Sequence, residues 1–147
     1  MPISSRLYLL SAMGLLLACL AGCGSSDANV EPAIPSAVVS DLVNLTTQEA
    51  AALRFDKGFI YRPGGVRGII VVRQSAQQYL AFERNCSYQP YDACAKVSVD
   101  ASRFFLVDTC CASRFDLTNG LPTSGPARRS LRQYTTTLNG NLLYITN

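Results

Sequence analysis

The cysteines of this sequence and its lack of histidine together decide which chemistry the chain can carry out. The 147 residues include six cysteines and no histidine. Four cysteines fall in the second half of the chain, namely Cys86, Cys94, Cys110 and Cys111. Thiols in this number pair as disulfides or bind a metal. The absence of histidine excludes Ser-His-Asp and Cys-His catalysis, two-histidine zinc proteases and facial-triad iron oxygenases, and no residue pattern requires an enzyme.

The start of the chain has the pattern of a bacterial export signal. Arg6 precedes an apolar run from Leu7 to Leu20, which is too short for a permanent membrane span. The following Ala21-Gly22-Cys23 completes a match to the lipobox, in which the cysteine sulfur receives a diacylglycerol. We predict a lipoprotein signal peptide over residues 1–22 and acylation of Cys23. The lipid would hold the exported chain on the cell membrane or outer membrane, facing the periplasm or the outside. An ordinary secretory signal is the alternative.

The rest of the chain divides into a linker and one domain. Residues 23–36 are small, polar and interrupted by proline, which predicts a lipidated flexible tether. Residues 37–147 are enough for one domain with its own core. Loss of Arg6 with the signal leaves twelve basic and ten acidic side chains, a balance of +2. This charge gives no case for nucleic acid, and we interpret its one basic cluster as a solvated face: Arg128, Arg129 and Arg132.

Hydrophobic alternation and turn residues predict an all-β domain. Thr46 and Glu49 have capping-box spacing, so we expect a short helix, or a single turn of one, over 47–53. Asn139-Gly140 is a strong hairpin signal. The cysteine-bearing stretches 85–95 and 108–126 are expected to be loops. The expected strands cover residues 37–45, 58–61, 68–73, 79–83, 96–99, 104–107, 134–138 and 142–146.

These two loops resemble the cluster-binding loops of the Rieske [2Fe-2S] family. The family pattern is C-x-H, a spacer, then C-x-x-H with a following G-S-x-F/Y-D and a later G-P-A/P turn. The matching segments here are Cys86-Ser87-Tyr88, Asp108 to Asp116 and Gly125-Pro126-Ala127. The resemblance implies an antiparallel β-sandwich or small barrel with an inserted cluster-binding β subdomain.

The resemblance also assigns positions. The four ligand positions become Cys86, Tyr88, Asp108 and Cys111, so one family ligand in four is retained. Ser113 stands where the family's serine donates a hydrogen bond toward the cluster, and Ala112 replaces the usual glycine. The lid over the site is expected at Gly125, Pro126 and Ala127.

Loss of both histidines removes the imidazoles that give a Rieske cluster its potential. The family correspondence pairs Cys94 with Cys110 and leaves Cys86 for Cys111 across the vacated position. A bond between neighbouring Cys110 and Cys111 would be strained. We therefore expect two disulfides, no cofactor and a structural or recognition role at the envelope.

Two other uses of these side chains stay open. The first is a one-electron carrier, an oxidoreductase-type protein that holds a [2Fe-2S] cluster through Cys86, Tyr88, Asp108 and Cys111. The second is a structural zinc on the four cysteines, in which the adjacent thiols of Cys110 and Cys111 would crowd a tetrahedron. A redox-active disulfide lacks the usual C-x-x-C spacing.

Overall fold

The computed structural model describes residues 32–147. The predicted signal at residues 1–22 and the predicted lipidation site Cys23 lie outside this range. Within the described range, no helix has the length and apolar character that a membrane crossing requires.

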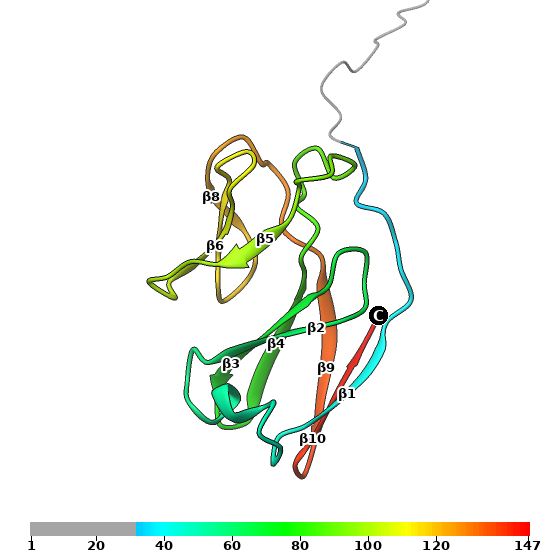
Figure 1. Ribbon diagram of the computed structural model, residues 1–147, viewed down its shortest axis with the longest axis vertical. Helices are drawn as coiled ribbons and strands as arrows, with labels where there is room; N and C mark the ends of the chain where they lie inside the picture. Colours follow the sequence, from blue (N-terminus) through cyan, green and yellow to red (C-terminus); the bar gives the residue numbers. More distant parts are fainter. Residues whose placement is uncertain (1–31) are drawn as a thin grey trace, which may run out of the picture. The chain divides into compact units, whose positions relative to one another are not determined.

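Six strands form one curled antiparallel sheet, whose order is β1-β10-β9-β4-β3-β2 (Figure 1). The predicted hairpin is confirmed, because Asn139 pairs with Leu142 and Gly140 has a φ of 58° in the turn. The strands are β1 (Ser40–Asn44), β2 (Phe59–Arg62), β3 (Ile69–Ser75), β4 (Gln78–Glu83), β9 (Gln133–Asn139) and β10 (Leu142–Thr146).

Four shorter strands between β4 and β9 form a second antiparallel sheet in the order β5-β6-β7-β8. This is the inserted subdomain that the sequence predicted, and Figure 1 shows it at the opposite end of the domain from the β9–β10 hairpin. Its last two strands have three residues each and were expected to be loop. The four strands are β5 (Val97–Val99), β6 (Phe105–Asp108), β7 (Arg114–Asp116) and β8 (Pro122–Ser124).

The apolar β3 strand serves two cores because successive side chains point to opposite faces of a strand. Ile70 and Val72 belong to a cluster that includes Cys86 and Phe115 from the site region. Ile69 and Val71 belong to a second cluster with residues of β1, β9 and β10. Burial of the first cluster fixes the inserted subdomain against the large sheet.

The expected helix is a single short turn, as one of the two expectations had it, but it starts later than predicted. A 3-10 turn covers Ala51–Arg54, and its N-cap Ala50 makes no side-chain capping bond. The capping-box prediction is therefore wrong. Upstream of this helix, Asn44 forms a separate turn in which its Oδ1 accepts hydrogen bonds from the N–H and hydroxyl of Thr46.

The end of the predicted tether is bound to the domain. Arg129 donates to the carbonyl of Pro32, and Arg132 Nη2 donates to the carbonyl of Ile34 at 3.2 Å. Asn147 Nδ2 donates to the carbonyl of Ala37 at 2.9 Å. Two arginines of the basic cluster thus bind the chain's own backbone.

Candidate functional site

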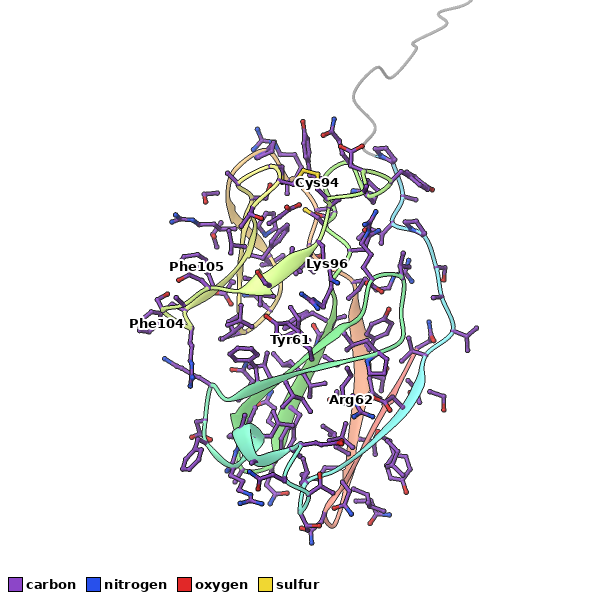
Figure 2. The ribbon with its side chains drawn as sticks, viewed as in Figure 1. Tyr61, Arg62, Cys94, Lys96, Phe104 and Phe105 are labelled. Carbon is purple, nitrogen blue, oxygen red and sulfur yellow. A yellow bond between two sulfur atoms is a disulfide. The ribbon has the colours of Figure 1, made fainter. Side chains whose placement is uncertain are left out.

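Two loops approach each other at the far end of the inserted region. The first leaves β4 and returns to β5, and the second connects β6 to β7. A disulfide joins them between Cys94 and Cys110, with 5.7 Å between the Cα atoms. This is the pairing that the family correspondence implied. Both cysteines are exposed, and Figure 2 shows Cys94 at the end of the domain away from the sheet residue Arg62.

The second loop makes a tight turn that is anchored on the buried residue Asp108. Its carboxylate Oδ1 accepts a hydrogen bond from the N–H of Cys110 at 2.8 Å, and its own N–H donates to the carbonyl of Ser113 at 3.0 Å. Ala112 has a φ of 60°, a conformation that glycine adopts more easily. This explains why the family's glycine position lies here. The turn brings the side chain of Cys111 over Asp108.

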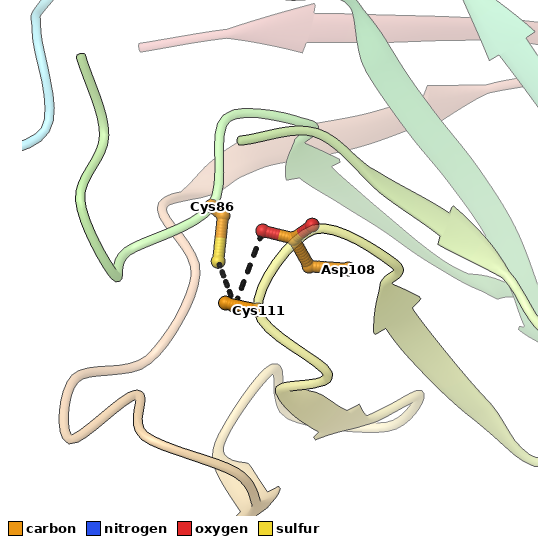
Figure 3. A group of neighbouring side chains, drawn as sticks. All are labelled: Cys86, Asp108 and Cys111. Atoms are coloured by element: carbon orange, nitrogen blue, oxygen red, sulfur yellow. Dashed lines mark hydrogen bonds between the residues drawn. The ribbon is translucent and has the colours of Figure 1, made fainter. Parts of the chain in front are cut away.

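Cys86 enters the same space from the first loop. Its N–H donates to the carbonyl of Ala95 at 3.1 Å, and its side chain is fully buried. The Sγ atoms of Cys86 and Cys111 are 3.9 Å apart, and both residues are free cysteines (Figure 3). The second disulfide that we expected between them is therefore not formed. The Cys111 thiol instead contacts Asp108 Oδ2 at 3.4 Å and Ser113 Oγ at 3.1 Å.

The three side chains form one compact group of two thiols and a carboxylate. One ligand-type atom from each of Cys86, Asp108 and Cys111 lies within 4.8 Å of the others. Burial, and then a hydrogen bond with Asp108, raise the pKa of the Cys86 thiol far above its usual range. Cys86 therefore stays protonated near neutral pH unless a positive charge enters the group.

The predicted lid contacts this group through Ser113. The N–H of Ala127 donates to Ser113 Oγ at 3.1 Å. Gly125 has a φ of 87°, and a Cβ added there would lie 2.5 Å from the Cα of Ser113. Only glycine fits this approach. Tyr88, the remaining predicted ligand position, is partly buried and packs against the core cluster that contains Cys86.

Sequence reasoning missed the polar support beneath the first loop. The buried carboxylate of Glu83 accepts hydrogen bonds from the N–H groups of Val66, Arg67 and Asn85 and from the Tyr134 hydroxyl, at 2.6 to 3.0 Å. Arg67 then donates to Asn85 Oδ1 and to the carbonyl of Ala93. The signal in the sequence is the glycine pair at residues 64–65, which follows Pro63 and is also typical of an ordinary tight turn. A side chain at Gly65 would in fact collide with Glu83 and Tyr134.

Solved structures supply the comparison that decides the fold. The cyanobacterial plasma membrane Rieske protein PetC3 from Synechocystis PCC 6803 is 27% identical, with a TM-score of 0.53 over 70% of this chain and 97% of that one. This chain has the Rieske fold. The ferredoxin of carbazole 1,9a-dioxygenase from Nocardioides aromaticivorans IC177 also matches, at 18% identity and a TM-score of 0.44, over 62% of this chain and 86% of that one. No protein-family model and no curated protein matches the sequence.

The residues of this site do not fit a Rieske [2Fe-2S] cluster. That cluster needs two thiolates on one iron and two imidazoles on the other, and the chain has no histidine. By position, Cys86 and Cys111 would bind different irons. Ligands on different irons are separated by two metal–ligand bonds and the iron–iron spacing. Here the two sulfurs touch at 3.9 Å, which leaves no room for a two-iron core.

Proposed function

We propose that this protein is an exported, lipid-anchored domain with a Rieske fold that has given up electron transfer for structural support or recognition at the cell envelope. The observation that carries the proposal is the direct contact between Cys86 and Cys111 at the place where a cluster would lie. The retained loops, their Cys94–Cys110 disulfide and the lid at Gly125 support a role for the shape of this end of the domain.

The disulfide supports the exported location. Such bonds persist in oxidising compartments and are rare in the cytosol. The lipobox at Leu20-Ala21-Gly22-Cys23 supports a lipid anchor. Radiolabelled fatty acid fed to cells that express the full chain should label the protein. The Cys23→Ser variant should lose the label, whereas Cys19→Ser, which changes a cysteine four residues earlier, should retain it. Equal labelling of all three proteins would contradict the anchor.

The loss of electron transfer can be tested by cluster reconstitution. The full chain would be incubated anaerobically with iron, sulfide and a thiol reductant, and iron and acid-labile sulfide would then be measured. We expect neither to bind, and we expect no electron paramagnetic resonance signal after reduction with dithionite. Two irons and two sulfides per chain, with the signal of a reduced cluster, would overturn the proposal.

A variant with the family's ligands serves as the positive control. Tyr88→His, Asp108→Cys and Cys111→His together restore C-x-H and C-x-x-H at the corresponding positions of the same loops. This triple variant should bind two irons and two sulfides under conditions in which the natural chain binds none. That result would place the loss of the cluster in the ligands and leave the fold competent.

A further inference from the structure

Beyond the proposed loss of electron transfer, the geometry of Cys86, Asp108 and Cys111 has a use of its own. We propose that these three side chains bind one thiophilic divalent cation such as Zn²⁺. The site is tetrahedral, and its fourth ligand comes from solvent. The proposal rests on the proposed function in one respect, because a cluster and a single ion cannot share the same ligands.

The distances fit one metal ion better than two. Two thiolates bound tetrahedrally to zinc at about 2.3 Å each are about 3.8 Å apart, and a thiolate and a carboxylate oxygen are about 3.5 Å apart. The Cys86 and Cys111 sulfurs are 3.9 Å apart, and the Cys111 sulfur lies 3.4 Å from Asp108 Oδ2. The third edge is at most 4.8 Å long. Two edges of the tetrahedron are thus present before any ion binds.

The charges favour a cation at this place. Asp108 is fully buried, yet no ion pair formed by the described residues includes it. A buried carboxylate without a countercharge is costly, and a bound cation removes that cost. The ion would also convert the thiols of Cys86 and Cys111 to thiolates, since metal binding releases thiol protons.

Neighbouring groups already orient two of the three ligands. The N–H of Cys110 holds Asp108 Oδ1, so that Oδ2 faces Cys111. Ser113 Oγ lies 3.1 Å from the Cys111 sulfur and is itself fixed by the N–H of Ala127. Its hydroxyl can donate to the thiolate once the proton leaves. Such outer contacts fix ligand geometry in metal sites. Cys111 is partly exposed, which gives the ion and a water a route inward.

The site differs from the tetrahedral site of four cysteines that the sequence left open. Two of those cysteines are consumed in the disulfide between Cys94 and Cys110. The carboxylate of Asp108 replaces them in part. A site with three protein ligands keeps one coordination position open, which is the arrangement of zinc sites that bind an exogenous molecule.

The test uses Co²⁺ as a spectroscopic substitute for Zn²⁺. The full chain would be purified in detergent and titrated anaerobically without a disulfide reductant, so that the Cys94–Cys110 bond stays formed and the thiols of Cys86 and Cys111 stay reduced. We expect saturation at one Co²⁺ per chain, with sulfur-to-cobalt charge-transfer absorption and the intense visible bands of a tetrahedral site. Added Zn²⁺ should displace the bound Co²⁺ and remove its absorption bands. Absence of thiolate bands, or a stoichiometry of two, would overturn the proposal.

Substitutions identify the ligands. Asp108→Asn retains the oxygen that accepts the Cys110 N–H and removes the charged oxygen, so it should fold. Loss of an outer contact weakens metal sites by about 10- to 100-fold, so loss of this direct ligand should weaken Co²⁺ binding by at least about 100-fold. Asp116→Asn is the matched control, because Asp116 makes the same kind of turn bond, to the N–H of Thr118, outside the cysteine group. Unchanged affinity in Asp108→Asn, or equal losses in both variants, would overturn the site.

Cys111→Ser tests the sulfur separately. It should abolish the charge-transfer absorption or reduce it to that of one thiolate, with a folded circular dichroism spectrum. Full retention of the absorption would place the ion elsewhere. Uptake of two irons and two sulfides would end the proposed function together with this inference. A chain that binds neither a cluster nor Co²⁺ would end this inference alone.

Discussion

Two pairs of cysteines each have one member in each of the same two loops, and the pairs differ in exposure and in bonding. Cys94 and Cys110 are exposed and form a disulfide, whereas Cys86 is buried, Cys111 is partly buried, and their sulfurs stay 3.9 Å apart. The outer pair holds the loops together from outside. The inner pair, beside Asp108, is left available for chemistry. The Cys94–Cys110 disulfide can thus hold the two loops together without a bond between the inner cysteines.

Removal of the outer pair should have the largest effect. Cys94→Ala with Cys110→Ala opens a loop closed over a sequence separation of 16 residues, and the free energy of unfolding should fall by about 3 kcal/mol. Urea denaturation under non-reducing conditions measures this change.

The matching change in the inner pair is the control. Cys86→Ala with Cys111→Ala removes two sulfurs but no covalent link, so the loss should be about 1 kcal/mol. Equal losses from the two double variants would mean that the inner pair is bonded as well, and the contrast between the pairs would disappear.

The lid provides a second way to disturb the inner pair without touching a cysteine. Gly125→Ala places a Cβ 2.5 Å from the Cα of Ser113, and we expect a loss of about 2 to 3 kcal/mol in the free energy of unfolding. Gly140→Ala is the control, since its φ is also positive at 58° but no atom lies within 4 Å of the added Cβ. It should cost about 1 kcal/mol. If Gly125→Ala lowers the free energy of unfolding no more than Gly140→Ala does, the close contact between Gly125 and Ser113 does not contribute to stability.

The turn between the two pairs should become more stable with glycine. Ala112 has a φ of 60°, which costs an L-residue about 1 kcal/mol relative to glycine. Ala112→Gly should therefore raise the free energy of unfolding by about 0.5 to 1 kcal/mol, measured by the same denaturation. A loss of stability would show that the Ala112 methyl group makes a contact that outweighs its strain.

Loss of an ion pair on the large sheet, far from the cysteines in sequence, should have the smallest effect on the free energy of unfolding. Arg62 donates to both carboxylate oxygens of Asp41 at 2.7 and 2.8 Å, and this bond lowers the pKa of Asp41. The stabilisation is thus complete above the unfolded pKa of about 4 and is lost as the pH falls through the lower folded value.

Comparison of the natural chain with Asp41→Asn tests this dependence. The natural chain should be more stable by about 0.5 to 1 kcal/mol at pH 7, and the difference should vanish toward pH 2. A difference that persists at pH 2 would show that the asparagine disturbs packing, and a difference that grows in acid would contradict the sign.

Prediction from the sequence succeeded where one local pattern was enough. Alternation located the long strands, Asn139-Gly140 located the hairpin, and the spacing of motifs in the two loops indicated the Rieske fold. It failed where distant residues decide the structure. Strands β7 and β8 are three residues long and exist through pairing with β6 and with each other, so no local signal marks them.

Of the four predicted ligand positions, three lie together, whereas Tyr88 packs against the core cluster. The sequence placed Cys86, Asp108 and Cys111 together through the family pattern, yet it joined the two cysteines. Whether two thiols bond depends on the direction of side chains set by the turn at Ala112 and by the hydrogen bonds of Asp108 and Ser113, and these bonds are not visible in spacing. The buried Glu83 network was missed for the same reason.

Native mass spectrometry of the exported full chain, sprayed from detergent without reductant, can show whether Cys86 and Cys111 hold neither a disulfide nor a cluster. One spectrum reports the number of disulfides and any bound inorganic mass. We expect a chain lighter by two hydrogens, for the single bond between Cys94 and Cys110, either bare or with the mass of one divalent ion. The added mass of two irons and two sulfides, or a loss of four hydrogens for two disulfides, would contradict it.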